Sequence, residues 1–181
     1  MTKRVMILAT NGFEQSELFE PKKNLENAGI ETTVVSLESG EIKAWDQDDW
    51  GKTIAVDKTL DEVTDSEGFD ALLLPGGQIN PDLLRVNEKA VAMVKAFDAA
   101  GKPIAAICHA PWLLIEAGLV EGKTATSYKS IRTDLRNAGA NVVDSEVAQD
   151  GNLITSRNPD DIPAFSDALI ARVQERVPEN A

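Results

Sequence analysis

Cysteine and histidine are nearly absent from this sequence, since each occurs once in 181 residues. A single cysteine excludes an internal disulfide, so we expect a free thiol that is kept reduced. One cysteine and one histidine are also too few soft ligands for a structural zinc site. Because no motif for another cofactor occurs, we expect the protein to work without a metal or a cofactor.

Long apolar runs and basic residues are scarce as well. No stretch approaches the length of a transmembrane helix, and the apolar run in the N-terminal "MTKRVMILATNGFE" is too short for a secretion signal. The chain has 18 Lys and Arg against 30 Asp and Glu, a net charge of −12, which opposes binding to nucleic acid and to anionic membranes. We therefore expect a cytoplasmic protein that binds neither.

The residues that are present predict a single α/β domain over residues 1–181. The hydrophobic fraction is 43% and the charged fraction 27%, values typical of a globular protein with a full core. Short β-like runs alternate with helical patterns, which is typical of a largely parallel sheet covered by helices. No internal repeat, low-complexity linker or break in composition divides the chain.

Four apolar runs of strand length are expected to form the sheet. They are Arg4–Ala9, Glu31–Leu37, the run in "DALLLPGG" and the run in "KPIAAIC". Between the first two, Leu18, Leu25 and Ala28 form an apolar helical pattern that ends at a glycine. Pro21 fits this helix only in its first turn, because proline removes an amide donor from any later turn.

Further elements are predicted outside these runs. The stretches "SGEIKAW" and "GKTIAVDKTL" flank the tight turn "DQDDWG", which indicates a small antiparallel excursion. A helix with Val91, Val94 and Phe97 on its apolar face follows the third strand. After a late strand in "GNLITS", a C-terminal helix is expected to start near residues 160–163. Its expected apolar face consists of Phe165, Leu169, Ile170 and Val173.

The single cysteine and histidine are adjacent, as Cys108 and His109 in "KPIAAICHAPWLL". A residue between a buried strand and the next helix lies on a sharp turn, near the amides of the helix N-terminus. These amides favour a thiolate, so we expect Cys108 to have a lowered pKa and to act as a nucleophile. The alternative is a small buried apolar residue. Adjacency does not establish a Cys–His pair, because neighbours on a turn often point apart.

The stretch "AAICHAPWLL" resembles the nucleophile-elbow motif A-x-x-C-H-G-P-x-x-L of the ThiJ/PfpI family. Further motifs of the family occur in the same order along the chain: "FEQSEL", "FDALLLPGG", "SYKSIRTDLRNAGA" and "TSRNPDDIPAF". The resemblance is greatest to the PfpI branch of intracellular peptidases, general stress proteins and protein deglycases. It implies a flavodoxin-like three-layer sandwich with a mostly parallel central sheet, similar to class I glutamine amidotransferases.

The resemblance also implies roles for individual residues. The family's nucleophile matches Cys108, and the carboxyl that contacts it matches Glu17, with Glu14 as the nearby competitor. A carboxyl beside a thiol in a poorly hydrated cleft should have a raised pKa, so it can stay protonated and move a proton. Without the family, Glu17 is explained equally well as a carboxylate at a helix N-terminus. The backbone amides of Gly77 and His109 would form an oxyanion site.

In the PfpI branch, the histidine beside the cysteine pairs with an acid from a neighbouring subunit. The matching position is Asp82 in "GGQINPDLLR", and such an acid would orient His109. The resemblance therefore implies a homodimer or a higher homo-oligomer. The alternative for Asp82 is a helix N-cap or first-turn carboxylate. Two substitutions relative to the family, Ala110 for glycine and Trp112 for glutamine, leave the nucleophile in place but put the substrate preference in doubt.

Three functions are compatible with these residues. The first is a stress-response hydrolase of the deglycase or glutathione-independent glyoxalase type, which uses Cys108 on reactive carbonyls or glycated groups. The second is an intracellular cysteine peptidase with Cys108, His109 and Asp82 as its triad. A standard amidotransferase triad is excluded, because it needs a second histidine far downstream. The third is a non-enzymatic sensor of oxidative stress, or a chaperone, whose thiol is oxidised. We favour the first.

Overall fold

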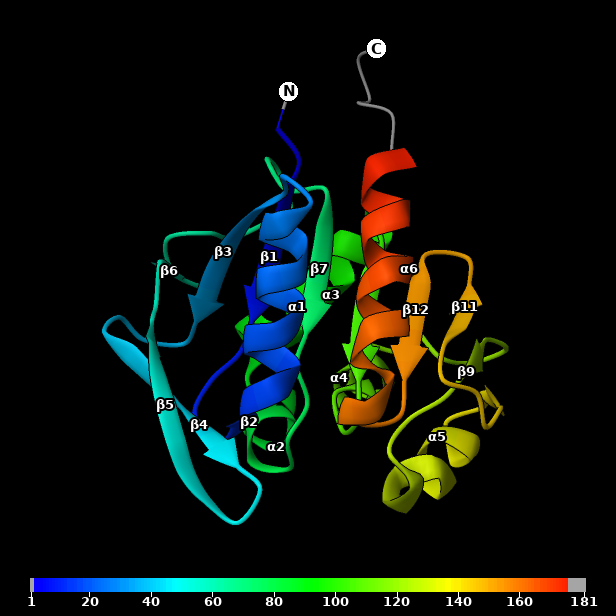
Figure 1. Cartoon of the computed structure of the whole chain (residues 1–181). Helices are drawn as coiled ribbons and strands as arrows, with labels where there is room; N and C mark the ends of the chain where they lie inside the picture. Colours follow the sequence, from blue (N-terminus) through cyan, green and yellow to red (C-terminus); the bar gives the residue numbers. More distant parts are fainter. Residues whose placement is uncertain (1, 176–181) are drawn as a thin grey trace.

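The computed structural model describes residues 2–175 and has a central seven-stranded sheet (Figure 1). The strands lie side by side in the order β11-β12-β8-β7-β1-β3-β6. Their bounds are Ala148–Asp150 (β11), Leu153–Ser156 (β12), Ile104–Ile107 (β8), Ala71–Leu74 (β7), Arg4–Leu8 (β1), Glu31–Ser36 (β3) and Lys58–Thr59 (β6). Every pair is parallel except β11 with β12.

The order of the main parallel strands identifies the fold. Numbered along the chain, β3-β1-β7-β8-β12 reads 2-1-3-4-5, which is the order of the flavodoxin-like doubly wound sheet. The four apolar runs predicted from the sequence form β1, β3, β7 and β8, and the late strand forms β12. The predicted flavodoxin-like three-layer architecture is thereby confirmed.

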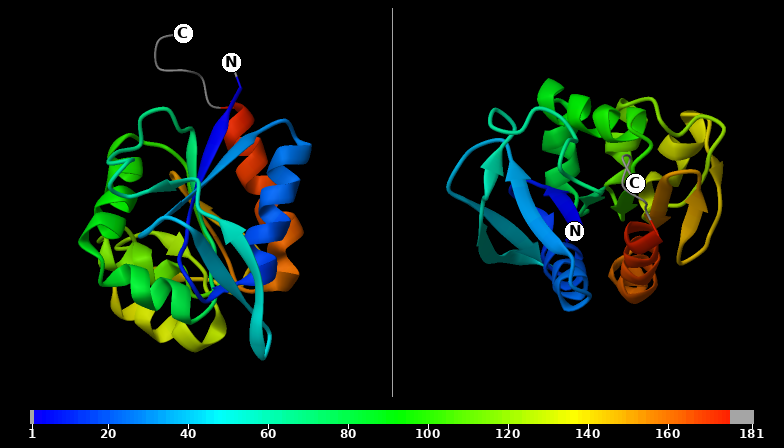
Figure 2. Two further views of the ribbon diagram at one scale, coloured as in Figure 1. Left: turned by 90° about the vertical axis from the view of Figure 1, so that its left-hand side faces the viewer. Right: turned by 90° about the horizontal axis from the view of Figure 1, so that it is seen from above.

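Helices cover both faces of the sheet (Figure 2). Helices α1 (Gln15–Asn27) and α6 (Ile162–Glu175) lie together on one face, while α2 (Ile79–Arg85), α3 (Glu88–Ala99) and α4 (Pro111–Glu116) lie on the other. Strand residues alternate between the two layers, as the twofold period of a strand requires. In β1, Met6 and Leu8 pack in one core cluster, while Val5 and Ile7 pack in the other.

Smaller elements surround the sheet. The predicted antiparallel excursion is formed by β4 (Glu41–Asp46) and β5 (Asp49–Ala55), and β4 also pairs with β2 (Phe13–Glu14). The segment between β8 and β12 contains β9 (Thr124–Ala125), α5 (Arg132–Asn137), β10 (Asn141–Val142) and a 3-10 turn at Lys129–Ile131. A second 3-10 turn, Pro159–Asp161, leads into α6. None of the helices that the structure describes is long and apolar enough to cross a membrane.

Three details differ from the sequence predictions. Pro21 lies inside α1, beyond its first turn, and removes the amide that would donate to the carbonyl of Glu17. Its side chain is buried on the same helix face as Glu17, Leu18 and Leu25, and we attribute the continuing helix to the packing of this face. Val91 and Ile170, which were expected on buried faces, are only half-buried, because both faces are centred on neighbouring residues.

Candidate active site

Three parallel strands bring the predicted site residues together at their carboxyl ends. Cys108 directly follows β8, the turn with Gly76 and Gly77 follows β7, and Glu17 lies in the first turn of α1, shortly after β1. Strands β1 and β7 are neighbours, and the chain leaves them toward opposite edges of the sheet. Doubly wound folds bind ligands at such a switch point, so the topology places these residues where a site is expected.

The backbone of Cys108 has the conformation of a sharp turn. Its φ angle is 66°, in the left-handed region that residues with a side chain rarely adopt. Neighbouring segments hold it there: its amide donates to the Ser156 carbonyl over 3.1 Å, and its carbonyl accepts from the Tyr128 amide over 2.8 Å. Helix α4 begins three residues later. The thiol is therefore fixed between strand and helix, as the sequence predicts.

Glu17 is completely buried beside this thiol. The Gly76 amide donates to its Oε1 over 3.0 Å, and its Oε2 is buried without a hydrogen-bond partner among the described residues. The carboxyl is close enough to Cys108 for each group to shift the pKa of the other. Burial, with a smaller contribution from the charge of Glu14, raises the pKa of Glu17 to about 8. Glu17 is thus protonated at neutral pH, as the sequence predicts, and can donate a proton toward the sulfur.

The competitor, Glu14, occupies a different place. It is half-buried at the end of β2, and burial and the nearby charge of Asp46 raise its pKa. The carboxyl that contacts Cys108 is that of Glu17, so the geometry favours Glu17 over Glu14 as the acid of the site. The charge of Glu14 raises the pKa of Glu17, and Glu17 in turn affects the thiol.

The pKa of Cys108 differs from the sequence prediction. Only 6% of Cys108 is exposed, and this burial raises the pKa of the thiol, as does any negative charge on Glu17. The backbone amides of Gly77 and His109 oppose this effect by hydrogen-bonding the sulfur. With Glu17 protonated the repulsion disappears, so the thiol and the carboxyl titrate as a coupled pair. Burial therefore raises the pKa of Cys108, whereas the sequence led us to expect a pKa lowered by the helix N-terminus.

Gly76 and Gly77 allow the close approach of three strand ends. A Cβ on Gly76 would lie 2.6 Å from both the Cys108 Cβ and the Ile107 carbonyl oxygen, and would also clash with the Glu17 carboxyl. Gly77 has a φ of 83°, and a Cβ there would lie 2.5 Å from the Gly12 carbonyl oxygen. Glycine is therefore required sterically at both positions. The Gly77 and His109 amides, predicted to form an oxyanion site, both face the sulfur.

The side chain of His109 points toward the thiol, although neighbouring side chains on a turn often point apart. Its Nδ1 lies 3.1 Å from Sγ of Cys108, and its Nε2 lies 3.4 Å from Oγ of Ser130. The ring stacks on Tyr128 with centroids 4.7 Å apart and meets the edge of Trp112 at 5.2 Å. Burial lowers the pKa of His109, so the imidazole is neutral at pH 7.

Asp82 does not join the site within one chain. It is exposed in the first turn of α2, and no hydrogen bond or ion pair to His109 is found among residues 2–175. This placement matches the alternative of a first-turn carboxylate, and it leaves a role in a neighbouring subunit as a prediction. No group of three or more His, Cys, Asp or Glu in the described part of the chain is arranged to hold a metal ion.

Three residues near the site were missed from the sequence. Asn80 is fully buried: its Oδ1 accepts from the Thr10 amide over 2.8 Å, and its Nδ2 donates to the Pro75 and Gly76 carbonyls. It thereby ties the end of β1 to the turn after β7. Tyr128 and Ser130 contact His109 from a segment quoted only as a family motif. The only sequence feature that pointed to Tyr128 and Ser130 was this polar motif, and it does not show that the two residues lie close to His109.

The fold and the site together define a class of protein: a flavodoxin-like α/β sandwich with a cysteine on a strand-to-helix turn and a buried acid beside it. Residues 3–172 match the model of the DJ-1/PfpI family, and the chain belongs to this family. The resemblance found in the sequence motifs is thereby confirmed.

Known relatives support the assignment over nearly the whole chain. General stress protein 18 of Bacillus subtilis is 46% identical over 177 residues, which cover 97% of this chain and 100% of the relative. Deglycase TK1284 of Thermococcus kodakarensis is 45% identical over 162 residues, covering 90% of this chain and 94% of the relative. Among solved structures, DJ-1beta of Drosophila melanogaster aligns with a TM-score of 0.87 and 32% identity, covering 97% of this chain and 92% of that chain.

Proposed function

We propose that the protein is a cysteine-dependent enzyme that converts reactive dicarbonyls, or their adducts on amino groups and thiols, to hydroxy acids. The observation that carries the proposal is the contact between Cys108 and the fully buried, protonated Glu17. A nucleophile beside a neutral acid suits a reaction in which a carbonyl is attacked and protons are then moved. The similarity to a protein named as a deglycase supports the same chemistry.

The reaction on methylglyoxal can be written with these residues alone. The Cys108 thiol adds to the aldehyde: a bond forms between sulfur and the aldehyde carbon, the S–H bond breaks, and the proton ends on the former carbonyl oxygen, which gives a hemithioacetal. Glu17 first gives its proton to the ketone oxygen, and the resulting carboxylate removes the proton of the first carbon to form an enediol. Glu17 then returns that proton to the second carbon and takes up the hydroxyl proton of the first, which oxidises the first carbon, reduces the second and restores the protonated carboxyl. The product is a lactoyl thioester, which water hydrolyses to lactate and free thiol. The Gly77 and His109 amides would stabilise the oxyanions.

A cysteine peptidase is the second candidate, favoured by the 3.1 Å contact between Cys108 Sγ and His109 Nδ1. A Cys–His pair can attack an amide if the imidazole is held in place by a third group. As a triad with Asp82 this mechanism needs an aspartate from a second copy, because Asp82 is exposed on its own chain. The peptidase mechanism does not need the protonated carboxyl of Glu17. We therefore rank the peptidase second.

Self-association is the further part of the proposal. Helix α2 and the residue that follows it, Val86, expose three apolar side chains: Ile79 at 37%, Leu83 at 43% and Val86 at 80%. They lie beside Asp82, the residue that the PfpI resemblance assigns to a neighbouring subunit. A second copy that covers these side chains would bring Asp82 to an interface.

The test is lactate release by reduced protein. Wild type and Cys108→Ala would be incubated with methylglyoxal, and separately with methylglyoxal-treated N-acetyl-arginine and N-acetyl-cysteine, with scavenging of free methylglyoxal controlled in each assay. Multiple turnovers by wild type and none by the variant would support the proposal, and the preferred substrate would separate glyoxalase from deglycase. Absence of turnover on all three substrates, with the thiol shown to be reduced, would refute it.

A further inference from the structure

The His109 ring is fixed on several sides by residues of its own chain. Nδ1 faces Cys108 at 3.1 Å, and Nε2 faces the hydroxyl of Ser130 at 3.4 Å. Tyr128 stacks on the ring with an interplanar angle of 25°, and Trp112 meets it at 67°. The plane of the imidazole and the direction of both nitrogens are thereby determined without a second subunit.

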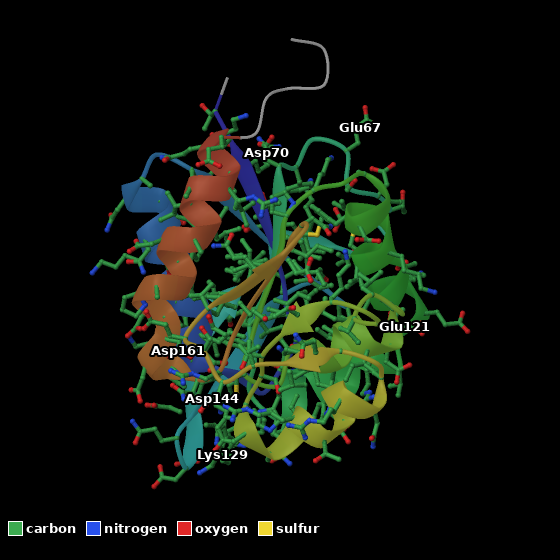
Figure 3. The ribbon with its side chains drawn as sticks, turned by 90° about the vertical axis from the view of Figure 1, so that its right-hand side faces the viewer. Glu67, Asp70, Glu121, Lys129, Asp144 and Asp161 are labelled. Carbon is green, nitrogen blue, oxygen red and sulfur yellow. The ribbon has the colours of Figure 1, made fainter. Side chains whose placement is uncertain are left out.

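The segment that carries Ser130 is itself anchored. Arg132 donates to the Ser127 carbonyl and to Asp144, while Arg157 donates to both Asp144 and Asp161. Figure 3 shows Lys129, the neighbour of Ser130, at the same end of the molecule as Asp144 and Asp161. The 3-10 turn with Ser130 is thus tied to the loop after β12, so its hydroxyl has a defined position relative to the imidazole.

The tautomer of a neutral imidazole decides what it can do to the thiol. With the proton on Nδ1, the ring can only donate a hydrogen bond to the sulfur. With the proton on Nε2, the lone pair of Nδ1 faces the thiol and can accept its proton. The group that binds Nε2 therefore determines whether His109 can act as a base.

We propose that Ser130 is a positioning residue whose Oγ accepts the Nε2 proton of His109, so that Nδ1 takes the proton of Cys108. The inference rests on the proposed function only in that Cys108 is the nucleophile. In this step the Sγ–H bond breaks, an Nδ1–H bond forms and the electron pair stays on sulfur. The resulting imidazolium keeps its Nε2–H bonded to Ser130. Asp82 of a second copy is the competing group for the same nitrogen.

The first test reads the tautomer directly by 15N NMR. Because the chain has one histidine, selective labelling gives an unambiguous signal for each ring nitrogen of His109. We expect the shift of an unprotonated nitrogen at Nδ1 and of a protonated one at Nε2. In Ser130→Ala we expect a mixture of both tautomers, and in Ser130→Thr, which keeps the hydroxyl, the wild-type pattern. A wild-type spectrum with the proton on Nδ1 overturns the proposal.

The second test needs no substrate, so it separates this inference from the proposed function. The rate of Cys108 alkylation by iodoacetamide reports the reactivity of the only thiol in the chain. We expect Ser130→Ala to lower this rate roughly tenfold at pH 7 and Ser130→Thr to restore it. Ser39→Ala, at an exposed serine, is the matched control. If Asp82→Asn changes the tautomer and the rate while Ser130→Ala changes neither, Ser130 does not position His109.

Discussion

The amide of Gly76 donates to Oε1 of Glu17 over 3.0 Å, although the two residues are 59 positions apart. This bond connects the turn after β7 to the first turn of α1 and fixes the carboxyl beside Cys108. The backbone thereby holds one oxygen of Glu17, while the thiol interacts with the same carboxyl. Most of the following predictions therefore depend on the protonation state of Glu17.

Glu17→Gln should separate proton transfer from folding. Glutamine has the same shape and can still accept from the Gly76 amide, but it cannot move a proton. We expect kcat for lactate formation to fall by about 10²-fold or more, with no loss of thermal stability. Steady-state kinetics and a thermal melt measure the two effects. Unchanged kcat would show that Glu17 is structural.

The stability of the protein should decrease with pH on account of Glu17. The unfolded chain loses this proton near pH 4.5, whereas the folded chain keeps it up to about pH 8. Between these values the folded state binds the extra proton, so its contribution to the free energy of unfolding falls as pH rises. The slope is up to about 1.4 kcal/mol per pH unit.

The difference between wild type and Glu17→Gln isolates this effect, because the other titrating groups are shared. Urea unfolding from pH 5 to 8 should show a free energy of unfolding that falls with pH more steeply in wild type than in the variant. Parallel pH dependences of the two proteins would mean that Glu17 is ionised in the folded state, contrary to the assignment above.

Gly76→Ala should damage both the site and the fold. The added methyl group would lie 2.6 Å from the Cys108 Cβ and from the Ile107 carbonyl oxygen, so the strand ends must separate. We expect a loss of about 1–3 kcal/mol in the free energy of unfolding, together with a large fall in kcat/KM. Gly40→Ala is the control: its φ is 104° but its surroundings are open, so it should cost stability and leave activity unchanged. Equal activity of both variants would contradict the close approach.

Self-association should depend on the outer surface of α2. Leu83→Glu places a charge among the exposed apolar side chains of Ile79 and Val86 and should shift sedimentation toward the monomer. Ser39→Glu adds the same charge at an exposed serine outside this helix. If wild type sediments as a monomer at micromolar concentration, the prediction of self-association through α2 is wrong.

Much of the fold could be predicted from the sequence, because it depends on local patterns. Apolar runs of strand length and helical periodicity predicted the main strands and helices, and these are where the structure has them. Pro21 was misjudged for a physical reason. The rule concerns an isolated helix, whereas α1 packs the buried Pro21 beside Leu18 and Leu25 and continues.

The site could be predicted only as far as its residues lie next to strand ends. Cys108 was found in this way, whereas the roles of Glu17 and Gly77 were implied by the family resemblance, which also chose Glu17 over Glu14. Ser130 could not be found, since its contact with His109 spans 21 residues and depends on how a polar segment folds back. The direction of the shift in the Cys108 pKa was also predicted wrongly, because burial depends on the packed core and not on the local turn.

The most direct test of the central claim is the reaction of methylglyoxal in D2O, followed by proton NMR of the product. The account predicts that wild type forms lactate with deuterium at C2, because Glu17 carries the migrating proton and exchanges it with solvent, and that Cys108→Ala forms none. Lactate that forms equally with Cys108→Ala, or that retains the aldehyde hydrogen at C2, would contradict proton transfer by a Cys108–Glu17 pair.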